Sequence, residues 1–265
     1  MHMRVEATVA DVASGSPNAP LKLGPEAAVI EAAVALAVAR ESLVVITTSP
    51  PVIVGGYNVL SVIRGRANPW SALYTTRAAD VAWTPIYARP EEGLGEVLDR
   101  MRSAGRYNAL IMEGDSISGL LTTLDIMRFL HGTGALRGVA PRGSAAIAVD
   151  PDTPLGNAID LMMAKGIRRL LLSGTEFAVS DRSLMRGTLD GGLLLRLRDD
   201  PEGTLSDPIT KYSYVLERPA IIPEGADAHE AAELILRAED RVAVTEDRGA
   251  ILTPWDLSIR LLLDM

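Results

Sequence analysis

The side chains with the clearest chemical potential form a threonine–aspartate pair that occurs twice with the same spacing. Thr122 and Asp125 follow one short apolar segment, and Thr253 and Asp256 follow another. At both places a predicted strand ends and a predicted helix begins. Backbone N–H groups are unpaired at a helix start and the helix dipole is positive there, so the position suits an anion. A threonine hydroxyl there is suited to bond a phosphate, and the aspartate to accept hydrogen bonds from ribose hydroxyls.

The same sequence pattern also has a purely structural interpretation. A Thr-x-x-Asp sequence at a helix start is an ordinary cap, worth about 1 kcal/mol. An isolated copy favours the cap, whereas recurrence at the same position of a repeat favours ligand binding. The capping interpretation predicts a ligand-independent scaffold or protein-interaction module, and the sequence leaves both open.

Four prolines anchor a repeat that runs through the chain. Each follows a short apolar segment and precedes an acidic residue, and the four are Pro25, Pro90, Pro151 and Pro223. A helical apolar pattern, two short strands and a second helix follow each proline. The proline and the later strand–helix junction stand at 25 and 55, 90 and 122, 151 and 180, and 223 and 253. The four copies therefore share one register, which is typical of a repeat architecture.

The repeat predicts an α+β fold of four β-α-β-β-α units that form two pseudo-twofold pairs. The second helices are predicted at 57–64, 123–131, 182–185 and 254–263, the third being short. We expect residues 1–138 to form the first pair, with repeats at about 20–65 and 84–131. Residues 139–265 should form the second pair, with repeats at about 145–187 and 218–263 and a linker at 188–217. Each pair is expected to bury its strands against each other.

Composition excludes several classes of protein. The chain has 265 residues, a net charge of −8 and no cysteine, which disfavours nonspecific nucleic-acid binding and excludes disulfides and thiol nucleophiles. No apolar run approaches the roughly 20 residues that span a bilayer and no signal peptide is predicted, so we expect a cytoplasmic protein without a membrane partner. The three histidines, His2, His131 and His229, are interpreted as isolated groups without metal-ligand spacing. No metal site is therefore predicted. No nucleophile–base pair or phosphate loop is found, so an enzyme is not predicted either.

With this order of elements and this junction, the chain resembles the cystathionine-β-synthase (CBS) domain family over about residues 20–263. Four copies would make two CBS pairs (Bateman modules), as in the γ regulatory subunit of AMP-activated kinase and stand-alone prokaryotic CBS proteins. The resemblance implies a non-enzymatic regulatory protein that requires no cofactor. It implies AMP, ADP, ATP or S-adenosylmethionine as ligand in clefts between paired repeats, a separate and unknown effector protein, and a monomer or homodimer.

The resemblance also implies which residues hold the ligand. Asp125 and Asp256 match the ribose-binding acid, and Thr122 and Thr253 match the hydroxyl on the phosphate side. The first strand, whose backbone contacts adenine, contains Ile86 or Ile221. The start of the second strand often carries a basic residue, and the residues at or near it here are Arg106, Asn108, Arg168, Arg169 and Arg241.

The first and third copies depart from this pattern. Gly55 and Asn58 replace the threonine and aspartate in the first, and Ser180 and Ser183 replace them in the third. Neither copy keeps the carboxylate, so each pair is expected to have one good site and one degenerate site, to which Ser180 contributes. Three of the arginines at or near the second strands, Arg168, Arg169 and Arg241, fall in the second pair, so we expect the stronger nucleotide site on Asp256.

Overall fold

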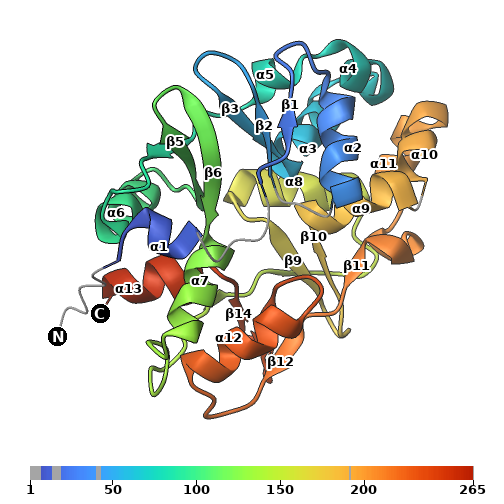
Figure 1. Cartoon of the computed structure of the whole chain (residues 1–265). Helices are drawn as coiled ribbons and strands as arrows, with labels where there is room; N and C mark the ends of the chain where they lie inside the picture. Colours follow the sequence, from blue (N-terminus) through green and yellow to red (C-terminus); the bar gives the residue numbers. More distant parts are fainter. Residues whose placement is uncertain (1–6, 14–18, 40–42, 191, 265) are drawn as a thin grey trace. The chain divides into compact units, whose positions relative to one another are not determined.

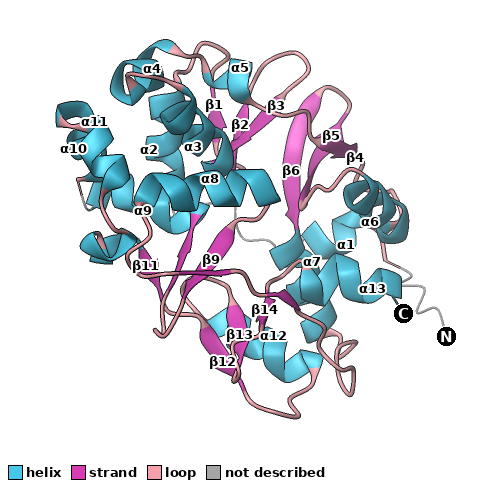
Figure 2. Ribbon diagram, turned by 180° about the vertical axis from the view of Figure 1, so that it is seen from behind, coloured by secondary structure: helices cyan, strands magenta, loops and turns pink. Residues whose placement is uncertain are grey.

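The computed structural model describes residues 7–13, 19–39, 43–190 and 192–264, and it contains four copies of the predicted unit (Figures 1 and 2). The first copy is β1 (Lys22–Leu23), α2 (Val29–Ala39), β2 (Leu43–Ile46), β3 (Val52–Gly55) and α3 (Gly56–Gly65). The second is β4 (Ile86–Ala88), α6 (Leu94–Ser103), β5 (Asn108–Glu113), β6 (Ser116–Thr122) and α7 (Thr123–Gly132). The third is β8 (Ala148–Val149), α8 (Leu155–Lys165), β9 (Arg169–Leu172), β10 (Ala178–Ser180) and α9 (Asp181–Asp190).

The fourth copy differs only in its last helix. It is β12 (Ala220–Ile222), α12 (Ala228–Arg237), β13 (Ala243–Thr245), β14 (Ala250–Leu252), the π-helical turn η3 (Asp256–Arg260) and α13 (Leu261–Asp264). The predicted α+β class and the order of elements within each copy are therefore confirmed. In the part of the chain that the structure describes, no helix is both long and apolar enough to cross a membrane.

Each copy pairs its strands in the same way. The first strand is parallel to the second, and the second is antiparallel to the third. In the second copy this register places Asn108 opposite Thr122, and in the third it places Arg169 opposite Ser180. The start of the second strand thus lies beside the strand–helix junction, where a repeat can combine side chains from both segments.

Elements outside the four copies are more extensive than expected. They are α1 (Val9–Ala13), α4 (Pro69–Thr75), α5 (Ala78–Val81), β7 (Ser144–Ala145), α10 (Leu193–Asp199), α11 (Pro201–Ser206), η1 (Ile209–Lys211), η2 (Ser213–Val215) and β11 (Leu216–Glu217). β11 pairs with β10 and β7 pairs with β14, so these short strands extend the sheets of the third and fourth copies. The predicted linker 188–217 is therefore largely ordered secondary structure.

The prediction of a short helix at 182–185 is wrong, because α9 extends over Asp181–Asp190. Gly187 lies inside this helix. A Cβ atom added there would lie 2.5 Å from Val215 Cγ1, so the glycine allows η2 to pack closely instead of ending the helix. A glycine in a helical pattern has a packing role as well as a terminating one.

The chain forms two compact units, each of which combines alternate copies. Unit 1 consists of Met1–Pro20, Pro85–Ala146 and Pro219–Met265, and it contains the second and fourth copies. Unit 2 consists of Leu21–Thr84 and Ile147–Arg218, and it contains the first and third. These units do not coincide with the predicted division at residue 138. The pairing of consecutive copies through their strands stays a prediction.

Helix packing holds the two copies of each unit together. In unit 2, α2 packs on α9, and α3 packs on α8 and α9. Arg64 of α3 reaches Asp160 of α8 with two hydrogen bonds, one of them 2.7 Å from Nε to Oδ1. In unit 1, α7 packs on α12 and η3. The apolar cores divide in the same way, with separate clusters in unit 2 and unit 1.

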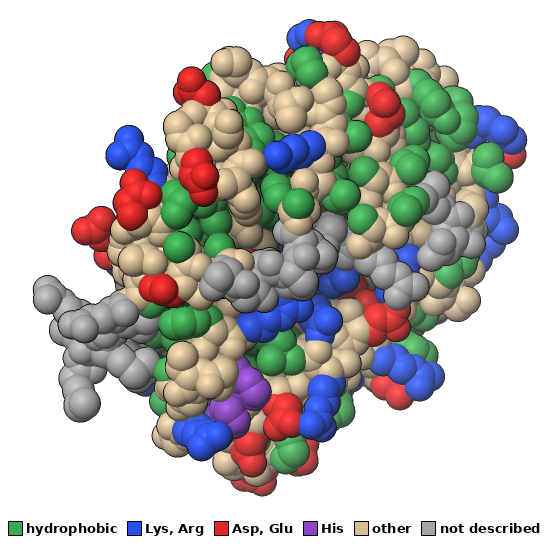
Figure 3. Space-filling model, in the orientation of Figure 1, with side chains coloured by type: hydrophobic (Ala, Val, Ile, Leu, Met, Phe, Trp, Pro, Cys, Tyr) green, Lys and Arg blue, Asp and Glu red, His purple; other side chains and the backbone are tan. Residues whose placement is uncertain are grey.

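His131 of α7 and His229 of α12 form a stacked pair within unit 1. Their ring centroids are 4.1 Å apart and their planes differ by 8°, and histidine side chains reach the molecular surface in Figure 3. The interpretation of the histidines as isolated groups is therefore wrong for these two. Burial lowers the pKa of His131 below its usual range, His229 and Arg137 act in the same direction, and Glu233 opposes them.

This pair predicts a loss of stability in mild acid. Because folded His131 binds its proton less tightly than the unfolded chain does, its contribution is intact above about pH 6.5 and is lost as the pH falls below that value. The slope for one proton is at most about 1.4 kcal/mol per pH unit. In urea unfolding measured between about pH 7 and pH 5, His131→Phe should show a shallower pH dependence than the wild type. Identical slopes would contradict this assignment.

Candidate ligand-binding junctions

At the second copy's junction, Thr122 and Asp125 cap α7. Asp125 Oδ2 accepts hydrogen bonds from the Thr122 backbone N–H at 3.0 Å and from its hydroxyl at 2.5 Å. The other carboxylate oxygen, Oδ1, faces Arg128 Nη1 at 3.3 Å, and the arginine side chain is 35% exposed. One oxygen of the buried carboxylate therefore serves the helix cap, and the other has a partner that a ligand could displace.

At the fourth copy's junction, Thr253 and Asp256 repeat this geometry. Asp256 Oδ2 accepts from the Thr253 N–H at 2.9 Å and from its hydroxyl at 2.7 Å. Here Oδ1 accepts a 2.9 Å hydrogen bond from Ser144 of β7, and Arg260 lies 3.5 Å away. The hydroxyl of Ser144, an exposed residue, already holds Oδ1 at a shorter distance than Arg128 holds the corresponding oxygen of Asp125, so this carboxylate is less available than Asp125.

At the first copy's junction, Asn58 takes the place of the aspartate, and both polar atoms of its side chain form hydrogen bonds with the backbone. Its Oδ1 accepts a 2.8 Å hydrogen bond from the Gly55 N–H. Its Nδ2 donates to the Val81 carbonyl at 2.6 Å, and the side chain is buried. The first copy therefore has a complete cap built from a neutral amide.

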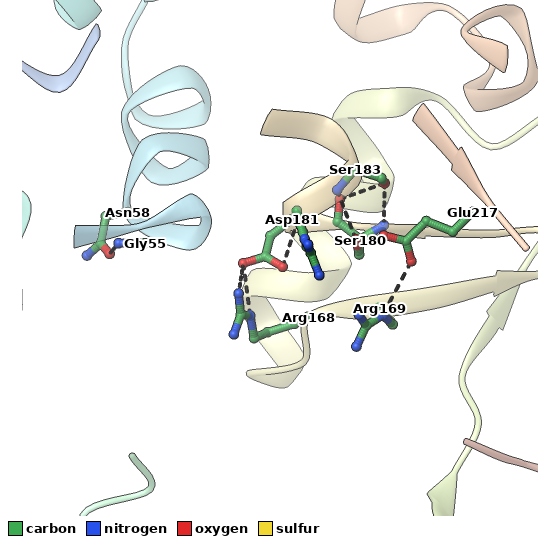
Figure 4. Close-up of polar contacts among 9 residues, drawn as sticks. Gly55, Asn58, Arg168, Arg169, Ser180, Asp181, Ser183 and Glu217 are labelled. Carbon is green, nitrogen blue, oxygen red and sulfur yellow. Dashed lines mark hydrogen bonds and ion pairs between the residues drawn. The ribbon is translucent and has the colours of Figure 1, made fainter. Parts of the chain in front are cut away.

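At the third copy's junction, two serines and a glutamate form a buried network (Figure 4). The Ser180 N–H donates to Ser183 Oγ at 2.9 Å, and the Ser183 N–H donates to Ser180 Oγ at 3.0 Å. The Ser180 hydroxyl donates in turn to Glu217 Oε1. Glu217 belongs to β11, and it supplies the carboxylate that the third copy lacks at position 183.

The three arginines expected near Asp256 all have other partners. Arg168 binds Asp181, with Nη2 2.8 Å from Oδ2, and Arg169 Nε lies 3.3 Å from Glu217 Oε2. Both of these pairs lie within unit 2. Arg241, in unit 1, donates from Nη1 to the Leu236 carbonyl at the end of α12. These arginines therefore do not favour Asp256 over Asp125, and which of the two junctions is the stronger nucleotide site stays a prediction.

Arg241 also has an unusual backbone. Its φ is 53°, a left-handed conformation that a non-glycine residue rarely adopts. Burial lowers the pKa of Arg241, and the positive charge of Arg128 lowers it further. The guanidinium groups of Arg128 and Arg241 therefore repel each other within unit 1.

Asn108 is the most informative residue at these junctions. Its side chain is fully buried, and neither Oδ1 nor Nδ2 has a hydrogen-bond partner among the described residues. A buried polar group without a partner costs about 1–3 kcal/mol, and such groups are rare enough to need a specific explanation. Asn108 stands opposite Thr122, so an unused donor and an unused acceptor lie next to the Thr122–Asp125 cap.

The remaining predicted residues lie on the first strands and near the second. Ile86 is half-buried and pairs with Ala109. Ile221 is 47% exposed, which leaves a large apolar side chain on β12 open to a ligand. The Arg106 N–H donates to the Met101 carbonyl at 2.7 Å, just after α6. No group of three or more metal-ligating side chains occurs within the described ranges.

Sequence reasoning missed three residues of the junctions, namely Ser144, Asp181 and Glu217. Ser144 and Glu217 each come from a segment that precedes a repeat and joins the sheet of the other copy in the same half of the chain. The spacing of the repeat itself gives no indication of such a partner. The only hint for Glu217 is a carboxylate directly after the apolar pair Val215-Leu216.

Comparison with known proteins agrees with this fold. The profile of the CBS domain family matches residues 78–132, and no curated protein matches the sequence. A protein from Methanocaldococcus jannaschii, described as a candidate archaeal homolog of γ-AMPK, superimposes with a TM-score of 0.77 at 13% identity, covering 96% of this chain and 99% of that one. An uncharacterised conserved protein from Pyrococcus horikoshii gives a TM-score of 0.56 at 14% identity, covering 97% of this chain and 100% of that one.

A shorter match was solved with a ligand. The CBS domain protein PAE2072 from Pyrobaculum aerophilum, complexed with AMP, gives a TM-score of 0.39 at 21% identity, covering 45% of this chain and 90% of that one. That likeness is too weak to bear on the ligand of this chain. The two longer matches show the fold, and the profile shows a CBS domain in the second copy. The chain thus contains a CBS domain at residues 78–132 and shares its fold with these two longer proteins.

Proposed function

We propose that the protein is a regulatory ligand sensor that binds an adenine nucleotide (AMP, ADP or ATP) or a related adenosyl ligand at the second copy's junction. The observation that carries the proposal is the buried, unpaired amide of Asn108 beside the Thr122–Asp125 cap. Folding leaves this amide unsatisfied at a free-energy cost. A polar ligand that fits the junction would form the missing hydrogen bonds and offset this free energy. In a purely structural junction the amide would only lower stability.

The junction offers the groups that such a ligand needs. Asp125 Oδ1 accepts from ribose hydroxyls once Arg128 turns away, and the released guanidinium is then available to a phosphate. Asn108 supplies one acceptor and a two-proton donor. The Asp256 junction serves as a second, weaker site in unit 1, because Ser144 competes for its carboxylate.

Ligand binding would be signalled through helix packing. The ligand contacts the start of α7, and α7 packs on α12 and η3 of the fourth copy. A ligand that binds one arrangement of these helices more tightly shifts the population toward it. A separate effector protein would bind one of these arrangements more tightly, because the ligand site and the effector site are coupled only through a difference between the two states.

A ligand-independent scaffold is the second candidate. All four junctions complete a cap from the chain itself, with the carboxylate or amide already bonded to the backbone at three of them and with serines at the fourth. In this case Asp125 and Asp256 would contribute only to stability.

Titration of purified, ligand-free protein distinguishes the two candidates. AMP, ADP, ATP and S-adenosylmethionine are added separately, and the melting temperature and the heat of binding are measured. A sensor gains about 2.7 kcal/mol of stability at a ligand concentration a hundred times Kd. No response to any of the four ligands would favour the scaffold. Turnover of ATP that a single substitution abolishes would point to an enzyme and contradict both.

A further inference from the structure

The third copy's junction differs from the others because an acidic side chain from outside the repeat lies inside it. Glu217 is 1% exposed. It reaches the junction because β11 pairs with β10, with Glu217 opposite Ala178 and Leu216 opposite Val179. A buried carboxylate is costly unless charged and polar partners surround it. The structure therefore places Glu217 at a position that favours a negative charge.

The partners of Glu217 explain that preference. Ser180 donates to Oε1, and Arg169, whose side chain is 16% exposed, lies 3.3 Å from Oε2. Ser180 stands at the strand–helix junction, where the repeat register places the threonine of the second and fourth copies. Arg169 stands at the start of the second strand, directly opposite Ser180. A hydroxyl and a guanidinium that could bind an oxyanion from solution bind the chain's own carboxylate instead (Figure 4).

A second carboxylate fills the space next to this pair. Asp181, which is 2% exposed, lies at the first position of α9 and binds Arg168. A Cβ atom at Gly56, the first residue of α3, would lie 3.2 Å from Asp181 Oδ2. Asp181 therefore occupies the space between the N-termini of α3 and α9, where the helix dipoles favour a negative charge. Arg168 and Arg169, just before and at the start of β9, are thus each paired with a buried carboxylate.

We propose that Glu217 is a built-in anionic occupant of the third copy's junction, where it excludes phosphate and phosphate-bearing ligands. Removal of its carboxylate should turn Ser180 and Arg169 into a site for inorganic phosphate. This inference concerns unit 2 alone, so it holds whether or not the junctions of unit 1 bind an adenosyl ligand.

The test measures the binding of inorganic phosphate to the full-length Glu217→Ala protein. The substitution removes a carboxylate partner of the largely buried Arg169, so the melting temperature in phosphate-free buffer should fall by roughly 6–12 °C. Added phosphate should restore part of that fall saturably, and calorimetry should detect one more phosphate site than in the wild type. The control is the double variant Glu217→Ala with Arg169→Met, which should show no phosphate response beyond that of the wild type.

Two results would overturn the proposal. One is a folded Glu217→Ala protein whose phosphate response equals that of the wild type. The other concerns Glu217→Ser, which leaves space for phosphate and keeps a small polar side chain, and which decides the matter if the alanine variant fails to fold. Phosphate must raise the melting temperature of Glu217→Ser more than that of Glu217→Ser with Arg169→Met. Equal shifts would mean that phosphate does not bind where the Glu217 carboxylate lies. Failure of the proposed function would appear separately, as a wild-type protein that binds none of the adenosyl ligands.

Discussion

Asp125→Ala is expected to weaken the binding of an adenosyl ligand roughly tenfold to a hundredfold, because hydrogen bonds to a charged group contribute about 1.5–3 kcal/mol. Asp125 Oδ1 is the carboxylate oxygen that the α7 cap does not use. The loss should appear as a higher Kd in calorimetry and as a smaller ligand-dependent shift in melting temperature. Both readouts compare the variant with its own ligand-free state.

The substitution also removes a helix cap, so a matched control is needed. Asp227 caps α12 in unit 1, and its Oδ1 accepts a 2.9 Å hydrogen bond from the Glu230 N–H. Asp227 lies at the start of the first helix of its copy and does not lie where the third strand meets the second helix. Asp227→Ala should therefore lower stability without changing Kd. If Asp125→Ala keeps the wild-type Kd, or if both variants lose affinity equally, Asp125 is a cap and the scaffold becomes the better account.

The fold was predictable because short-range patterns determine it. The prolines, the helical apolar faces and the alternating strands depend on neighbours a few residues apart, and all four copies share them. The strands β4 and β12 coincide with the short apolar segments that precede Pro90 and Pro223. The length of α9 was not predictable, because the role of Gly187 depends on Val215, which lies in another segment.

The partners of the site residues were much less predictable than the elements that carry them. Repeat register correctly brings Thr122 to Asp125 and Thr253 to Asp256. It does not say that Arg169 meets a glutamate 48 positions later, or that Ser144 meets Asp256 across 112 positions. These contacts arise from strand additions between segments that the repeat does not include. Side-chain charge shows that a partner is needed, but only the folded chain shows which one.

Asn108→Leu is expected to stabilise the ligand-free protein by about 1–3 kcal/mol and to weaken ligand binding. Leucine has nearly the same shape as asparagine, and it removes a buried donor and acceptor that have no partner in the described structure. The same atoms are the ones that we propose for the ligand, so stability and affinity should change in opposite directions. Urea unfolding without ligand measures the first effect, and calorimetry measures the second.

Asn58→Leu provides a matched control, because it makes the same change at the corresponding junction of the first copy. Asn58 is also buried, but both of its amide atoms are bonded, to the Gly55 N–H and the Val81 carbonyl. Its loss should leave those two backbone groups unsatisfied and destabilise the protein by about 1–3 kcal/mol. Opposite signs of the change in unfolding free energy for the two variants would show that the Asn108 amide has no partner in the ligand-free protein and is available to a ligand. If Asn108→Leu destabilises the protein as Asn58→Leu does, the Asn108 amide has a structural partner and the proposed site loses its main support.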